Sequence, residues 1–213
     1  MLRHAPPAQC ESFERLRVIF KPNAIMFTLI GAAACREHGL ARRTDDLDIV
    51  VSPYRDAMSA LHSTGEFVPT PESVDWTSRT CTLKDTRTGV LLDFLTGGIR
   101  INDHTFLPRG VVHDPLPIPI PSGYGDVAAL PVLIGMKVSA IISGMKILEL
   151  GATSGVRTTA EIRQDVEDVQ SLIFQSKLPR DLPLGNNEVE SRYQQIFDDV
   201  YMRSAAMLRR SPE

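Results

Sequence analysis

Residues 27–51, with the sequence FTLIGAAACREHGLARRTDDLDIVV, decide the fold of this chain. The apolar residues at the end of this stretch favour a strand. Because side chains alternate along a strand, Asp46 and Asp48 are expected on one face, while Leu47 and Ile49 point into a core. Two neighbouring carboxylates repel each other, and magnesium prefers carboxylate oxygens as ligands. The stretch therefore predicts a metal site on a strand.

The first half of the stretch predicts a phosphate site beside that strand. Gly31 ends an expected strand over 25–30, and a two-turn helix over 33–38 follows, with Gly39 in the left-handed conformation after it. The unpaired N–H groups at the start of this helix, at Gly31 and Ala32, would face an anion. In the alternative interpretation Asp46 and Asp48 are surface residues of an ordinary strand. The ordered combination of turn, helix, Thr44 and strand favours the functional interpretation.

These residues also carry a family resemblance. Ile30-Gly31-Ala32, followed by Asp46-Leu47-Asp48, resembles the signature of the nucleotidyltransferase superfamily, which has the polymerase-beta-like fold. With His38-Gly39 and Arg43-Thr44 included, the chain is most similar to the small nucleotidyltransferases of the AbiEii-like toxin group. The family usually has Gly or Ser at the position of Ala32, where a methyl group would stand close to the nucleotide phosphates.

The family requires a third carboxylate on a neighbouring strand, and Asp93 is the well-formed candidate. It lies within residues 89–96, GVLLDFLT, where apolar residues flank it on both sides. An unpaired carboxylate buried there would cost several kcal/mol unless a cation or hydrogen bonds compensate it. The alternative is that Asp93 lies at a strand end in contact with water. We expect Asp93 to belong to the site, because a polar residue inside a buried run usually has a partner.

The resemblance implies an enzyme that transfers a nucleotidyl group from an NTP to an acceptor hydroxyl, with two Mg²⁺ ions, which Mn²⁺ could replace. It implies metal ligation and catalysis by Asp46, Asp48 and Asp93. It also implies nucleotide binding by Gly31, Ala32, Arg43, Thr44 and Lys137. An RNA end, a protein side chain and a small molecule such as an antibiotic remain open as acceptors, and the toxin-like resemblance favours RNA.

Two further functions stay open. A catalytically inactive module for binding or regulation is one of them, supported by Ala32 and by Gln164-Asp165, where relatives commonly have Lys-Asp. Retention of all three aspartates argues against this alternative. Metal-dependent phosphoester hydrolysis would use the same ions with water as the acceptor, but the chain lacks a supporting histidine cluster.

The remaining sequence predicts an α+β protein, with a small mixed sheet and helices on one face, followed by a helical C-terminal region. Strands are expected over 66–68, 79–85 and 90–95, and helices over 11–20 and 54–62. Prolines at 115, 117, 119 and 121 exclude a helix and indicate an extended boundary segment over 111–124. We therefore expect a nucleotidyltransferase core over 1–125 and a helical region over 126–213.

The helical region is expected to contain helices over 127–150, 159–176 and 188–209. Lys137 is either a triphosphate contact or a lysine that extends from an apolar helix towards water. Asp165 and Asp168 lie three residues apart on one helix face, and we expect them to be structural, pairing with Lys137 or Arg163. The last helix would pack on the body of the protein or on another subunit, which would make a homo-oligomer.

Composition indicates a cytoplasmic protein that does not enter a membrane. The chain has 213 residues, 43% of them hydrophobic. No apolar run approaches the roughly 20 residues of a membrane span, and the N-terminus lacks the apolar core of a signal peptide. The three cysteines are widely spaced, which indicates free thiols. The net charge of −3 gives no global attraction to nucleic acid, although arginines gather around the aspartate loop.

Overall fold

The computed structural model describes residues 2–71, 80–97, 119–149, 158–180 and 194–202. The chain divides into two compact units. The first contains Met1–Ile99 and Pro117–Ala128, and the second contains Arg100–Leu116 and Ala129–Glu213. The first unit holds all six strands of the described residues, and the second holds helices.

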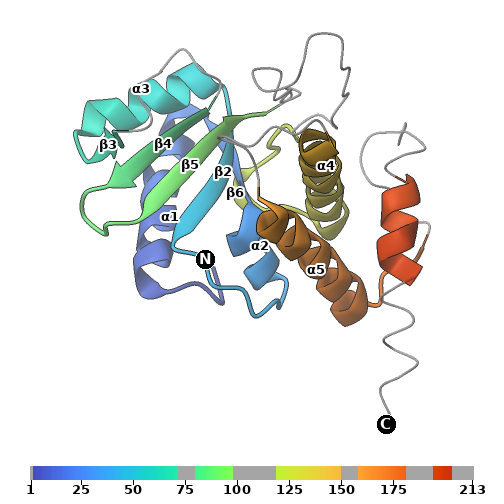
Figure 1. The fold of residues 1–213 in the computed structure, drawn as a ribbon. Coiled ribbons are helices and arrows are strands. Elements are labelled where there is room, and N and C mark those ends of the chain that lie inside the picture. The colour runs from blue at the N-terminus through green and yellow to red at the C-terminus, as the bar shows by residue number, and fades with distance from the viewer. Residues whose placement is uncertain (1, 72–79, 98–118, 150–157, 181–193, 203–213) are drawn as a thin grey trace. The chain divides into compact units, whose positions relative to one another are not determined.

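The first unit is built on one six-stranded mixed sheet with the strand order β3-β4-β5-β2-β1-β6 (Figure 1). The pairs β2 with β5 and β1 with β6 are parallel, whereas the other neighbours are antiparallel. The strands are β1 (Met26–Ile30), β2 (Asp46–Ser52), β3 (Phe67–Pro69), β4 (Thr80–Asp85), β5 (Leu91–Thr96) and β6 (Tyr124–Val127). The predicted α+β class with a mixed sheet is confirmed.

Helices α1 (Pro7–Phe20) and α3 (Tyr54–Thr64) contact each other, and α3 also contacts β2 and β3. Figure 1 shows α1 behind the strands. The rings of Phe13 and Phe20 on α1 meet Phe27 of β1 edge to face, each with a centroid separation of 5.3 Å. Such pairs add to the burial of apolar area. The face of the sheet that carries Phe27 is therefore the core face.

A buried polar network also fastens α1 to the sheet. Ser12, which is fully buried, donates its hydroxyl to Asp85 Oδ2 at 2.8 Å. Arg15 pairs with Asp85 and with Glu66, and its guanidinium lies over the ring of Phe67, 4.9 Å from the centroid. Buried polar groups need such partners, because an unmade hydrogen bond costs about 1–3 kcal/mol. The network holds α1 at the end of β4.

The second unit contains α4 (Leu130–Glu149) and α5 (Thr159–Ser176), which pack against each other, and a helix over 194–202. Thr158 and Glu161 form a capping box at the start of α5, so this helix begins as predicted. The other residues of the predicted terminal helix over 188–209 lie outside the described part of the chain. No described helix is long and apolar enough to span a membrane.

Three predicted helix starts are wrong. Helix α2 (Gly31–Glu37), expected over 33–38, begins two residues earlier. The helix expected from residue 127 begins at Leu130, because Val127 belongs to β6 and pairs with Leu29 of β1. Pro131 fits the first helical turn, where its missing N–H group leaves no hydrogen bond unmade. Helix α1 starts at Pro7 and not at residue 11, for the same reason. The strand β6 was not predicted, and it lies across the boundary expected at residue 125. The extended segment expected over 111–124 is described only from residue 119 onwards.

Candidate active site

Three half-buried aspartates lie on adjacent parallel strands. On β2, Asp46 and Asp48 alternate with Leu47 and Ile49, which are fully buried. On β5, Asp93 stands between two fully buried residues of the core face. Asp48 and Asp93 are direct partners in the register of β2 and β5. Because side chains of paired residues share a face, and paired strands lie roughly 4.8 Å apart, all three carboxylates belong to the face opposite the core.

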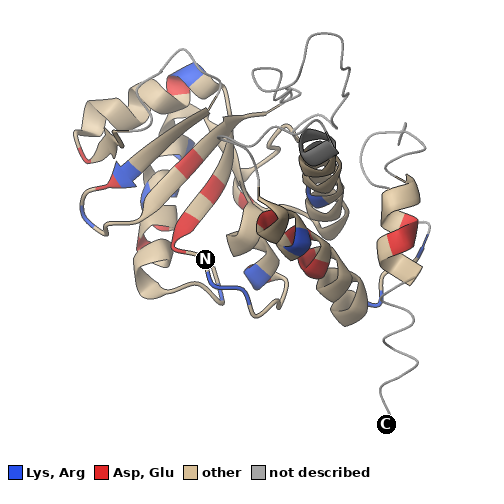
Figure 2. Cartoon of the chain, viewed as in Figure 1, with Lys and Arg blue, Asp and Glu red and all other residues tan. Residues whose placement is uncertain are grey.

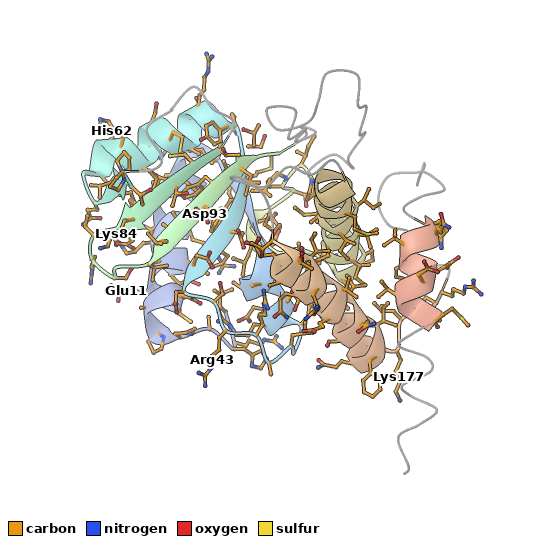
Figure 3. All side chains as sticks on the ribbon, viewed as in Figure 1. Glu11, Arg43, His62, Lys84, Asp93 and Lys177 are labelled. Atoms are coloured by element: carbon orange, nitrogen blue, oxygen red, sulfur yellow. The ribbon has the colours of Figure 1, made fainter. Side chains whose placement is uncertain are left out.

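Threonine hydroxyls donate hydrogen bonds to two of the three carboxylates, those of Asp93 and Asp46. Thr82 on β4 is the register partner of Asp93, and its hydroxyl donates to Asp93 Oδ1. The Thr44 hydroxyl, in the loop before β2, donates to Asp46 Oδ1. We call the face of β4, β5 and β2 that carries Thr82, Asp93, Asp48 and Asp46 the acidic face. Figure 2 shows acidic positions next to each other on β2 and β5, and Figure 3 labels Asp93.

The surroundings of Asp93 disfavour its ionised form. Burial raises the pKa of the Asp93 carboxyl, and the negative charge of Asp46 raises this pKa further, while the hydrogen bond from Thr82 partly offsets both effects. Asp46 and Asp93 repel each other when both are ionised. A site of this kind favours either a proton on Asp93 or a cation beside it.

The turn between β1 and α2 (Gly31–Glu37) makes room for Asp48. Gly31 has a φ of 65°, which L side chains rarely adopt. A Cβ atom at this position would lie 1.8 Å from Asp48 Oδ2 and 2.5 Å from Asp48 Cγ. The absence of a side chain at Gly31 therefore lets the Asp48 carboxylate lie against the turn. The sequence indicates a glycine turn here, but it does not show this contact.

Gly31→Ala is expected to displace the Asp48 carboxylate as well as strain the backbone. Backbone strain alone costs about 1–3 kcal/mol. Gly65→Ala is the matched control, because Gly65 has a φ of 67° and nothing lies within 4 Å of its added Cβ. We expect Gly31→Ala to lower the free energy of unfolding more than Gly65→Ala does, measured by urea denaturation. Equal losses in the two variants would show that Asp48 does not occupy this space.

The predicted nucleotide-binding residues fall in different parts of the structure. Gly31 and Ala32 open α2, whose start has no side-chain cap. Arg43 is exposed on the loop before β2 (Figure 3), and Thr44 in the same loop bonds to Asp46. Lys137 belongs to α4 in the second unit. No observation tests nucleotide binding by these five residues, and it stays a prediction.

Lys137 is held by two buried carboxylates of α5. Its Nζ donates to Asp165 Oδ1 at 2.6 Å and to Asp168 Oδ2 at 2.8 Å, as expected from the sequence. Gln164 adds a donor to Asp168 Oδ1 at 3.2 Å. Burial lowers the pKa of the Lys137 ammonium, but the two carboxylates outweigh burial and hold this pKa above its usual value. The cluster joins α4 to α5.

The acidic face has the oxygen donors that a hard divalent cation prefers, but its carboxylates do not lie close enough together to form a complete metal site. Among the described residues, no three His, Cys, Asp or Glu side chains are gathered closely enough to hold a metal ion. In Asp46 and Asp93, one carboxylate oxygen is engaged by a threonine hydroxyl. Carboxylates on one face of adjacent strands match magnesium in chemical type.

Cys10, Cys35 and Cys81 are free thiols, as predicted.

Two residues of this site were missed by the sequence analysis. Thr82 is an ordinary strand residue in the sequence, and its contact with Asp93 depends on the register of β4 and β5. Gln9 on α1 donates its side-chain amide to the carbonyl oxygen of Thr44 at 2.8 Å. Neither contact has a local sequence signal, because each joins segments that are distant along the chain.

Comparisons with known proteins find similar solved structures. The antibiotic-resistance factor ANT(2'')-Ia is 12% identical, with a TM-score of 0.47 and coverage of 96% of this chain and 97% of that chain. An antigenic nucleotidyltransferase-like protein from Paracoccidioides brasiliensis is 16% identical, with a TM-score of 0.48 and coverage of 96% and 94%. A STING-associated CdnE c-di-GMP synthase from Capnocytophaga granulosa is 10% identical, with a TM-score of 0.34 and coverage of 97% and 85%.

No family model matches the chain, and no curated protein matches it. At TM-scores below 0.5, the likeness to these solved structures carries no argument about activity. The functional argument therefore rests on the residues of the acidic face.

Proposed function

We propose that this protein transfers a nucleotidyl group from an NTP to an acceptor hydroxyl, in a reaction that depends on magnesium. The observation that carries the proposal is the register of Asp48 with Asp93, with Asp46 near enough to raise the pKa of Asp93. Three carboxylates on one face repel one another, and hard divalent cations bind such oxygen donors.

In this proposal Asp46, Asp48 and Asp93 hold two Mg²⁺ ions, with Mn²⁺ as a substitute. The ions supply charge neutralisation at the phosphates and activation of the acceptor hydroxyl. The three donors come from two adjacent strands, so the backbone of the sheet fixes their spacing. Gly31 contributes by leaving the space into which the Asp48 carboxylate fits.

The chain's own groups would then bind the nucleotide and move one proton. Asp93, whose pKa is raised, accepts the proton of the acceptor hydroxyl. The acceptor oxygen forms a bond to the α-phosphorus of the NTP, and the bond to the bridging oxygen breaks, so pyrophosphate leaves with the electron pair. The backbone N–H groups of Gly31 and Ala32 would meet the triphosphate, and the guanidinium of Arg43 would offset the charge of the leaving pyrophosphate.

The acceptor is an RNA end, a protein side chain or a small molecule, with RNA favoured by the toxin-like resemblance of the sequence. The net charge of −3 means that an RNA acceptor would be attracted by local basic residues and not by the whole chain. We place this activity in the cytoplasm, where NTPs and magnesium are available.

A transfer assay tests the proposal. The protein is incubated with each labelled NTP, total cellular RNA and either Mg²⁺, Mn²⁺ or EDTA, and labelled product is measured. We expect label transfer from at least one NTP with either metal and none with EDTA. Calorimetry should show that the triphosphate binds only weakly without Mg²⁺. Absence of transfer, together with equal NTP affinity in both conditions, would instead favour the inactive binding or regulatory module.

A further inference from the structure

Gln9 of α1 reaches the loop that leads into the acidic face. Its side chain is buried, with 3% of the residue exposed. The amide nitrogen donates to the carbonyl oxygen of Thr44 at 2.8 Å and, at a longer 3.5 Å, to that of Asp46. The amide oxygen accepts from Nη2 of Arg36 on α2. One side chain thus joins α1, α2 and the loop before β2.

The two carbonyl groups that Gln9 contacts belong to Thr44 in the loop and to Asp46, the first residue of β2. The same two residues also bond to each other through their side chains, because the Thr44 hydroxyl donates to Asp46 Oδ1. Holding the backbone at Thr44 keeps its side chain within reach of Asp46, and the Thr44 hydroxyl then orients the Asp46 carboxylate. Gln9 therefore constrains a side chain of the acidic face that it does not itself touch.

The chemistry of the contact explains why glutamine stands here. A primary amide is a donor and an acceptor at once, so it can serve the carbonyl groups and the guanidinium together. An apolar side chain of the same length would satisfy neither, and a lysine would repel Arg36. Gln9 is buried and its hydrogen bonds are partly shielded from water, which raises the cost of losing them.

We propose that Gln9 is a positioning residue that acts through Thr44 to set the orientation of Asp46 for metal binding and transfer. This inference rests on the proposed function of the acidic face. Groups that orient metal ligands typically change metal affinity or activity by about 10–100-fold when they are removed. Gln9→Met keeps the length of the side chain and removes both hydrogen-bonding atoms.

The test compares Gln9→Met with Ser12→Ala in the full-length protein. Ser12 is a matched control, because it lies one turn further along α1, is fully buried and forms hydrogen bonds with Asp85 and Thr88, away from the acidic face. Three quantities are measured: hydrogen exchange of the segment 40–46, the affinity of the protein alone for Mn²⁺, and kcat and KM for the NTP. Urea denaturation gives the stability of each variant.

For Gln9→Met we expect exchange in the segment 40–46 to be about fivefold faster, the equivalent of one lost hydrogen bond. Mn²⁺ affinity should fall about tenfold, and kcat should fall by a similar factor with KM nearly unchanged. Ser12→Ala should lose comparable stability and keep all three quantities. Gln9→Asn, which keeps a primary amide but is one methylene shorter, should show intermediate effects and serves if Gln9→Met does not fold.

The inference is overturned if Gln9→Met and Gln9→Asn leave exchange and Mn²⁺ affinity at the wild-type values, or if Ser12→Ala weakens Mn²⁺ binding as much as they do. Failure of the proposed function gives a different result. A wild-type protein that neither binds Mn²⁺ nor transfers a nucleotidyl group would overturn that function. In that case faster exchange of the segment 40–46 in Gln9→Met would still show that Gln9 holds the loop, and unchanged exchange would show that it does not.

Discussion

Asp93→Asn is expected to abolish nucleotidyl transfer and, at neutral pH, to raise the stability of the metal-free protein. Transfer is lost because the amide removes both a metal ligand and the proton acceptor. Activity should fall at least about a thousandfold, within the range that single groups provide by electrostatic and proton-transfer catalysis. The amide oxygen introduced by the substitution can still accept the hydrogen bond from Thr82, so we expect the fold to persist.

The gain in stability has a defined pH dependence. The pKa of Asp93 in the folded protein lies above its ordinary value of 3.8, because burial and Asp46 disfavour the ionised form. The folded protein therefore holds this proton more tightly than the unfolded chain does. The resulting destabilisation is absent below pH 3.8 and complete above the pKa of the folded protein. Asp93→Asn should stabilise the protein at pH 7, and this advantage should vanish as the pH falls towards 3.8.

Urea denaturation in EDTA over a pH series measures this dependence, and the transfer assay measures activity. Asp46→Asn and Asp48→Asn are expected to abolish transfer as well. Asp45→Asn is the matched control, because Asp45 is the exposed neighbour of Asp46 in the same loop. It should leave transfer unchanged. Wild-type turnover in all three variants of the acidic face would show that these aspartates are not the metal ligands.

The part of the acidic face that lies within one strand is predictable from the sequence. Alternation along β2 places Asp46 and Asp48 together, since a strand has a period of two residues. The sequence also points to Asp93, because a carboxylate in the middle of an apolar strand needs a compensating partner. The alignment of Asp93 with Asp48 cannot be predicted, because the sequence does not specify the register of β2 and β5.

The residues that hold these carboxylates could not be predicted, because their partners come from elsewhere in the chain. Thr82 meets Asp93 through the pairing of β4 with β5, and Gln9 reaches Thr44 from a helix 35 positions earlier. A glutamine on the buried side of α1 and a threonine in a strand have no local signature. The strand β6 was missed for a related reason, since Tyr124–Val127 is short and its pairing with β1 gives it its structure.

The lysine cluster of the second unit shows that a paired charge can be predicted when helical spacing provides the geometry. Asp165 and Asp168 lie on one face of α5 because residues three apart are neighbours on a helix. Their side chains are 4% exposed and that of Lys137 is 12% exposed, so the three charges are largely removed from water. A buried charge that loses its partner is expensive, whereas a complete neutral replacement is often tolerated.

Lys137→Met is therefore expected to destabilise the protein by about 3–5 kcal/mol, because it leaves two buried carboxylates without their cation. The full effect should be present at pH 7, since the raised pKa of Lys137 keeps the ammonium charged well beyond neutrality. The triple variant Lys137→Met, Asp165→Asn, Asp168→Asn should recover most of this loss, and urea denaturation measures both. A triple variant no more stable than Lys137→Met would contradict this account. The KM of the triple variant for the NTP then decides whether Lys137 also contacts the triphosphate.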